Sequence, residues 1–354
     1  MEFLFEYGLF FAKVATGVVA FVIIVSVIFS ASQKNKQSPE RGHLEITPLN
    51  QQFEHLKETM LLATVDESLQ KAEEKKLHKA KKKQLSNEKK ASKKNSNTSS
   101  ETKSKVYVLS FDGNVSASAV GHLREEVTAV LTQATPKDEV LLRLESSGGM
   151  VHSYGLASSQ LDRLRKKNIP LTVCVDKVAA SGGYMMACVA DKILAAPFAV
   201  IGSIGVVAQM PNFNKVLKKH DVDFELLTAG EHKRTLTMFG ENTDKDREKL
   251  NEQLEEIHLL FKNFITSQRK NIDIEKVATG EYWYGENALS LNLIDEIMTS
   301  DEYILSMKEK FEITHIKYKP VKTFSDKISK ISSSFTNKAI GSLEQKNHDK
   351  NIFK

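Results

Sequence analysis

The chain has only two cysteines, Cys174 and Cys188, among its 354 residues. Cys174 lies in an apolar segment that we expect to be a strand, and Cys188 lies in the helix expected after it. Both are therefore predicted to be buried small side chains rather than the two halves of a disulfide. The cysteine content does not identify the cellular compartment.

Aromatic residues are absent from the most basic part of the chain. Residues 71–105 are crowded with lysine and carry almost no large apolar side chains, which is typical of a solvated linker. This segment alone carries more positive charge than the chain's net charge of +5, so the remainder is slightly acidic. Nucleic acid is not an expected partner, because binding it requires a basic face with interleaved aromatics on a folded domain. A basic tether on anionic lipid is the alternative to a plain spacer.

Charged residues are absent from an apolar run at residues 14–29. A helix of about 21 residues, rising roughly 1.5 Å per residue, spans a bilayer. The run therefore predicts a transmembrane anchor at residues 9–30, after a tail of residues 1–8. A cleaved signal peptide is the alternative, but Glu2 and Glu6 precede the run, which is also too long for that role. Basic residues after the span favour a cytoplasmic body, although a large domain can override so modest a bias.

An alternating pattern of strands and helices begins at residue 105, after an amphipathic segment and the linker, which together cover residues 31–104. Near-continuous apolar strands that alternate with helices predict an α/β fold with a parallel sheet covered on both faces. This domain is expected to cover residues 105–319, with a flexible tail at residues 320–354. The expected strands are 106–111, 139–144, 171–175, further β structure within 192–207, and 224–227; the expected helices are 119–131, 150–165, one from 181, 212–219 and 244–269.

Two glycine-rich turns follow successive strands. Gly148 and Gly149 follow the second strand, and Ser181 and Gly182 follow the third. Because neighbouring parallel strands end at the same edge of a sheet, both turns are expected at one ligand-binding edge. One turn can then donate backbone N–H groups to an oxyanion while the other presents a nucleophilic hydroxyl. A glycine-rich turn with a helix-capping serine is the alternative interpretation.

A histidine base for this serine is not found in the sequence. The Gly-x-Ser-x-Gly elbow is also absent, since Ala179 stands at its first glycine. No histidine is set beside an acid that would fix its tautomer. A desolvated lysine is the other possible general base, and Lys233, just beyond the expected strand 224–227, is the candidate.

Several motifs together resemble the signal peptide peptidase A family of membrane-bound serine proteases, over residues 105–319. The family's nucleophile motif is matched by AASGGY at 179–184, its lysine stretch by AGEHK at 229–233, and its GSIGV segment by residues 202–206. A C-terminal family segment is similar to residues 280–289. The oxyanion turn reads ESSGG at 145–149 where relatives have NSPGG, so both glycines are kept while the asparagine and proline are missing.

The resemblance implies a role for each matching residue. Ser181 would be the nucleophile, Lys233 the general base, and Ser203 the residue that orients the lysine. Gly148, Gly149 and Gly182 would form the oxyanion hole. No metal, nucleotide or other cofactor is implied.

The resemblance also implies a crotonase-like or Clp-protease-like fold and a homo-oligomeric ring or dome. Since the chain has one serine motif and one lysine motif, the dyad is expected to form across a subunit boundary. The family would place the chain in a bacterial inner membrane, with its catalytic domain on the periplasmic side. The expected substrates are signal-peptide remnants or other unfolded or membrane-derived polypeptides. A non-proteolytic membrane scaffold and an acyl-CoA enzyme with a similar oxyanion hole are the alternatives.

Overall fold

The computed structural model describes most of the chain: residues 42–66, 68–76, 79, 82, 83, 103–230 and 233–321, with Gly8, Thr16, Val18 and Val19. The predicted anchor (9–30), the tail (320–354) and much of the linker lie almost entirely outside these residues. Among the described residues, no helix combines the length and apolar character that crossing a membrane requires. Chain contacts separate the unit Leu44–Tyr318 from a second unit, Met1–His43 with Lys319–Lys354.

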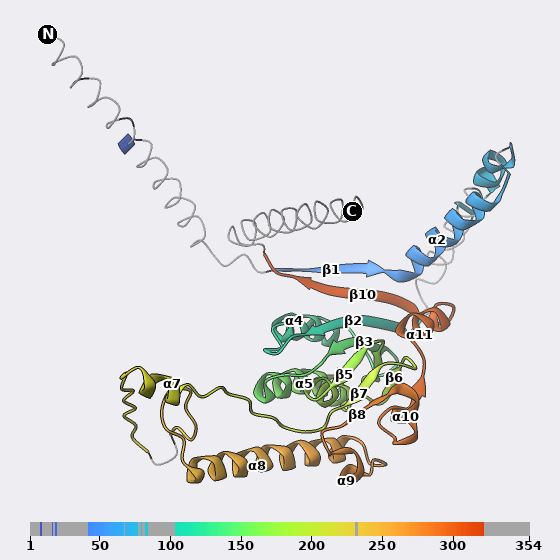
Figure 1. Ribbon diagram of the computed structural model, residues 1–354. Helices are drawn as coiled ribbons and strands as arrows, with labels where there is room; N and C mark the ends of the chain where they lie inside the picture. Colours follow the sequence, from blue (N-terminus) through green and yellow to red (C-terminus); the bar gives the residue numbers. More distant parts are fainter. Residues whose placement is uncertain are drawn as a thin grey trace, which may run out of the picture. The chain divides into compact units, whose positions relative to one another are not determined.

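A largely parallel sheet forms the centre of this unit (Figure 1). Its strand order is β1-β10-β2-β3-β4-β6-β9, while β5 pairs with β3 and β7, and β8 pairs with β7. The β7–β8 pair is antiparallel, and the pairs that join β2, β3, β4, β5, β6, β7, β9 and β10 are parallel. The strands are β1 (His43–Pro48), β2 (Lys105–Gly113), β3 (Glu139–Ser146), β4 (Leu171–Val175), β5 (Val178–Ala180), β6 (Lys192–Ala195), β7 (Val200–Gly202), β8 (Tyr282–Tyr284), β9 (Glu296–Ile297) and β10 (Glu312–Lys319).

Helices cover both faces of the sheet, which confirms the predicted α/β class. Because side chains alternate along a strand, Leu142 of β3 faces the larger core and Leu141 faces a smaller one. The larger core is covered by α4 (Val120–Leu131), α5 (Val151–Arg165) and α6 (Gly182–Ala187). The smaller core is covered by α11 (Ser300–Met307) and the first turns of α2 (Leu49–Thr64).

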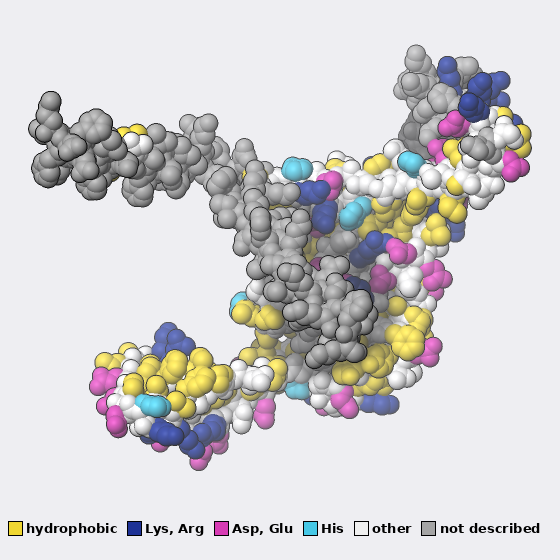
Figure 2. Space-filling view, turned by 45° about the horizontal axis from the view of Figure 1, so that its top comes forward, with side chains coloured by type: hydrophobic (Ala, Val, Ile, Leu, Met, Phe, Trp, Pro, Cys, Tyr) yellow, Lys and Arg dark blue, Asp and Glu magenta, His cyan; other side chains and the backbone are white. Residues whose placement is uncertain are grey.

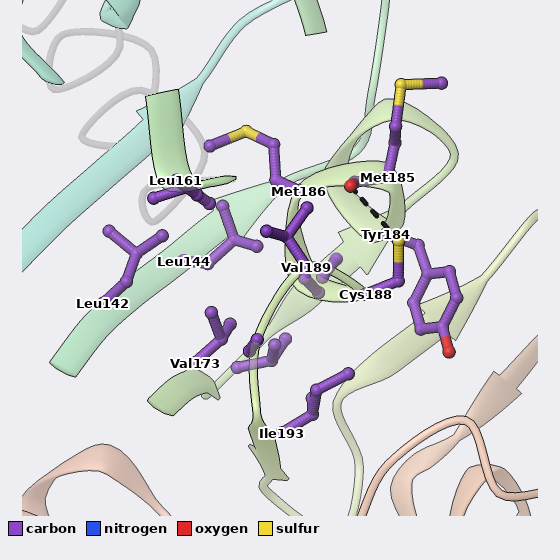
Figure 3. Packing of buried hydrophobic residues seen from close by; sticks show 14 of the residues in the cluster. Leu142, Leu144, Leu161, Val173, Tyr184, Met185, Met186, Cys188, Val189 and Ile193 are labelled. Carbon is purple, nitrogen blue, oxygen red and sulfur yellow. Dashed lines mark hydrogen bonds between the residues drawn. The ribbon is translucent and has the colours of Figure 1, made fainter. Parts of the chain in front are cut away.

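Helix α6 is buried in the larger core. Figure 3 shows Met186 and Val189 directed toward Leu144 and Leu161, while Tyr184 points to the other side of the helix. The Tyr184 hydroxyl donates a hydrogen bond to the carbonyl oxygen of Leu293 at 2.9 Å. The helix that follows Ser181 is therefore held rigidly by apolar packing and by one buried hydrogen bond.

The sheet also includes residues from before the domain start predicted at residue 105. Strand β1 pairs with β10, and the Asn50 side chain accepts from the N–H of Ile313 and donates to the carbonyl oxygens of Lys308 and Phe311. These contacts join residues more than 250 positions apart, so local hydrophobic periodicity does not reveal them.

Residues 206–243, here called the arm, leave the sheet and carry the short helix α7 (Asn214–Lys219) (Figure 1). The predicted strand at 224–227 is wrong, because these residues pair with no strand in the described structure and are exposed. The arm returns through α8 (Asp244–Gln268), whose start is a capping box between Thr243 and Asp246. Two short helices, α9 (Ile274–Val277) and α10 (Gly285–Ser290), follow α8 on either side of β8.

Candidate active site

Three loops meet at one edge of the sheet because their strands are in register. Ser146 of β3 is aligned with Ala179 of β5, and Ala180 of β5 is aligned with Gly202 of β7. The turns that follow these strands therefore lie side by side. They carry, in this order, Gly148, Ser181 and Ser203.

Ser181 has an unusual backbone conformation, with φ 52° and ψ −119°. Its N–H donates to the carbonyl oxygen of Gly202 at 2.7 Å, and its own carbonyl accepts from the N–H of Met185 at 3.0 Å. A non-glycine residue in such a conformation costs about 1–3 kcal/mol, and such strain clusters at functional sites. A strained strand-to-helix turn is also how a nucleophilic serine is exposed above an α/β sheet. Its side chain makes no helix-capping hydrogen bond, which argues against the alternative interpretation.

The turn at Gly148 lies directly against Ser181. Gly148 has φ +90°, and a Cβ placed there would come within 2.7 Å of the Ser181 Cβ and 2.8 Å of the Gly182 nitrogen. Only glycine fits such an approach, since both the space and the backbone conformation exclude a side chain. The structure thus brings together the two turns that the sequence singles out.

The N–H groups of these turns differ in their hydrogen bonding. The N–H of Gly148 donates to Oγ of Ser146 at 3.1 Å. In the described part of the chain, the N–H groups of Gly149 and Gly182 have no acceptor. These two donors are therefore available to an oxyanion, whereas the Gly148 N–H is already engaged.

A buried hydrogen-bond network stands behind the two turns. Oγ of Ser146 lies 2.5 Å from the Tyr154 hydroxyl oxygen and 3.1 Å from the carbonyl oxygen of Gly113, and its one proton has these two oxygens as acceptors. The Tyr154 hydroxyl donates to the carbonyl oxygen of Asn114 at 2.8 Å. Burial raises the pKa of the Tyr154 phenol above its ordinary value, so the group keeps its proton. Neither Ser146 nor Tyr154 is among the site residues predicted from the sequence.

A sequence signal for Ser146 does exist. Leu142, Leu144 and Ser146 alternate along β3 and face the same side of the sheet, so the serine occupies a core position. A polar side chain at a core position requires a hydrogen-bond partner. The sequence does not reveal that this partner is Tyr154.

Ser203 follows β7 and also has a positive φ, 51°. Its N–H donates to the carbonyl oxygen of Glu281 at 2.7 Å, which ties the loop to the segment before β8. The Trp283 ring packs over Gly202, where an added Cβ would lie 2.8 Å from the indole. Ser203 is thus held one strand away from Ser181, at the same edge of the sheet.

Lys233 lies in the arm and is exposed in the single chain. Its N–H donates to the carbonyl oxygen of Gly230 at 3.2 Å, and no polar contact of its side chain is found in the described part of the chain. The arm extends away from β5 and β7 (Figure 1). Within one chain, the structure therefore does not bring Lys233 to Ser181.

Apolar side chains are exposed along the arm, and Figure 2 shows them gathered on the lobe that it forms. Two of them, Val207 and Leu227, are 86% and 92% exposed. Exposed apolar patches of this kind mark interaction surfaces. No group of three or more His, Cys, Asp or Glu side chains suited to a metal ion occurs among the described residues.

Comparison with known proteins gives consistent matches over the chain. Residues 2–161 match the family model "Peptidase family S49 N-terminal", and residues 163–314 match "Peptidase family S49". The chain is 50% identical over 329 residues to "Probable protease SohB" of Haemophilus influenzae, which covers 93% of each protein. It is 52% identical over 306 residues to a protein of the same name from Buchnera aphidicola subsp. Schlechtendalia chinensis, covering 86% of this chain and 100% of that relative.

Proposed function

Because the chain belongs to peptidase family S49, we propose that it is a membrane-anchored serine endopeptidase in which Ser181 is the nucleophile and Lys233 the general base. The mixed α/β unit with its largely parallel sheet fits a Clp-protease-like fold of this family. The observation that carries the proposal is the strained backbone of Ser181 in contact with the Gly148 turn.

The proposed reaction is acyl transfer. A neutral Lys233 amine removes the proton of the Ser181 hydroxyl, whose oxygen attacks the peptide carbonyl carbon. The N–H groups of Gly149 and Gly182 stabilise the developing oxyanion, and each such donor is worth about 3 kcal/mol. The lysine ammonium then protonates the leaving amine, and water hydrolyses the acyl-enzyme. Ser203 orients the lysine amine from the adjacent loop.

The base is proposed to come from a neighbouring copy of the chain. Lys233 is exposed in an arm that leaves the body, and exposed apolar residues such as Val207 and Leu227 accompany it. Packing this arm against a second subunit would bury the apolar side chains and desolvate the lysine, which favours its neutral form. A ring or dome of subunits would repeat the contact around a closed symmetry.

The membrane location and the substrate class are proposed from the sequence. Residues 9–30, which carry one charge at Lys13, would hold the chain in a bacterial inner membrane with the peptidase unit on the periplasmic side. The substrates would be signal-peptide remnants or other unfolded polypeptides, which can enter the site as extended chains.

A serine-directed phosphonate probe tests this function on the full-length protein in detergent or lipid nanodiscs. We expect the probe to modify Ser181, and the wild-type protein to cleave an unfolded polypeptide such as casein. Ser181→Ala and Lys233→Ala should abolish both readouts, while Lys219→Ala, a second exposed arm lysine, should retain them. Cleavage that survives Ser181→Ala would refute the proposed nucleophile. A wild-type protein that is neither labelled nor proteolytic would instead support the non-proteolytic scaffold.

A further inference from the structure

One buried tyrosine contacts the turn at Gly182 directly and the turn at Gly148 through Ser146. The ring of Tyr154 packs against Gly182, where an added Cβ would lie 2.4 Å from Cγ of the tyrosine. Its hydroxyl lies 2.5 Å from Oγ of Ser146, which in turn accepts the Gly148 N–H at 3.1 Å. Tyr154 is completely buried and Ser146 is 2% exposed, so water cannot replace these contacts.

The hydrogen bonds of this network fix the orientation of both hydroxyl groups. The Tyr154 O–H donates to the carbonyl oxygen of Asn114, so the 2.5 Å bond between the two hydroxyls uses the Ser146 proton, for which the carbonyl oxygen of Gly113 is the second acceptor. With its proton directed away, the Ser146 oxygen is free to accept the Gly148 N–H. That bond fixes the plane of the peptide before Gly148, and therefore the course of the next peptide, which carries the Gly149 N–H.

We infer that Tyr154 and Ser146 are positioning residues that set the distance and orientation of the oxyanion turn relative to Ser181; this inference rests on the proposed peptidase function. Both side chains are buried, so they would act on the reaction through the two turns. Tyr154 supports the nucleophile turn with its ring and the oxyanion turn with its hydroxyl, so one side chain couples the two halves of the site.

The test uses Tyr154→Phe and Ser146→Ala in the full-length protein, because each removes a hydroxyl and keeps the buried apolar part. An oxyanion donor acts mainly in the transition state, so we expect kcat per probe-titrated site to fall about 10- to 100-fold. KM should stay within about twofold. The double variant should lose little more than the worse single variant, because both changes break one network.

Two matched controls separate positioning from ordinary core stability. Tyr107 and Ser158 are also buried, and their hydroxyls have no hydrogen-bond partner in the described part of the chain. Tyr107→Phe and Ser158→Ala should therefore keep the wild-type kcat per titrated site. A merely structural role would lower the melting temperature of the network variants while leaving kcat per titrated site unchanged.

The outcomes also separate this inference from the proposed function. If the wild type is active, and Tyr154→Phe and Ser146→Ala have the same kcat as the two control variants, the positioning role is wrong. The proposed peptidase function would then still stand. Simple additivity of the two losses would overturn the shared network. A wild type that neither reacts with the probe nor cleaves peptide would overturn the proposed function, and the positioning role with it.

Discussion

Gly148→Ala is the substitution that should separate the two turns of the candidate site most directly. The added Cβ would lie 2.7 Å from the Ser181 Cβ and 2.8 Å from both the Ala180 oxygen and the Gly182 nitrogen. Carbon atoms normally approach to about 3.5–4.0 Å, so the turns must move apart by roughly 1 Å. Alanine at φ +90° adds backbone strain of about 1–2 kcal/mol, and overpacking adds about 1–3 kcal/mol.

The expected result is a stability loss of about 2–5 kcal/mol with a fall in kcat of about 100-fold, since a 1 Å misplacement has that effect on a reacting geometry. Stability would be measured by urea denaturation, and kcat by peptide hydrolysis per probe-titrated site. Gly155→Ala is the matched control: this helical glycine has nothing within 4 Å of the added Cβ. It should keep full activity and gain about 0.5–1 kcal/mol. A Gly148→Ala protein with wild-type kcat would refute the close approach of the two turns.

Three further predictions concern the scaffold and the arm. Asp295→Asn removes the charge that pairs with both terminal nitrogens of Arg269 at 2.8 and 2.9 Å. Because the pair is only partly buried, the free energy of unfolding in urea denaturation should fall by about 1–3 kcal/mol, and an unchanged value would contradict this. Burial raises the pKa of the Glu126 carboxyl group. The stability contributed by the protonated Glu126 side chain is therefore lost as pH rises from the unfolded-state pKa through the folded-state pKa. Glu126→Gln should therefore raise the melting temperature near neutral pH but not below about pH 4. Equal gains in melting temperature at the two pH values would show that the buried carboxylate charge is not the reason. Leu227→Glu, at a side chain that is 92% exposed, should shift size-exclusion elution toward the monomer and abolish cleavage; an intact, active assembly would exclude the arm from the interface.

The sequence predicts the sheet well because its strands are apolar and alternate with helices. It also predicts that the turns at Gly148 and Ser181 meet, since parallel register alone carries neighbouring strand ends to the same edge. The direct contact of Gly148 with Ser181 depends on the φ of +90° at Gly148. A glycine in the sequence permits this angle, but the sequence alone does not show that the residue adopts it.

Other features depend on partners that lie far away in the sequence. β1 joins the sheet only through β10, and the Tyr154 network joins side chains from β3 and α5 to a backbone carbonyl oxygen of the loop after β2. At residues 224–227, by contrast, the sequence predicts a strand that the structure does not contain. This segment has the apolar composition of a strand, but pairing requires a neighbouring strand, and the arm supplies none in the described structure.

In the proposed mechanism, Ser181 of one subunit and Lys233 of another form the dyad. Mixing two inactive variants, Ser181→Ala and Lys233→Ala, through dissociation and reassembly or through co-expression tests whether the two residues come from different subunits. In an equal random mixture, about one quarter of the sites would pair an intact serine with an intact lysine from the neighbouring copy. Cleavage should therefore return to about that fraction of the wild-type rate. If mixed assemblies remain inactive while wild-type protein treated in the same way recovers, the dyad is not shared between subunits.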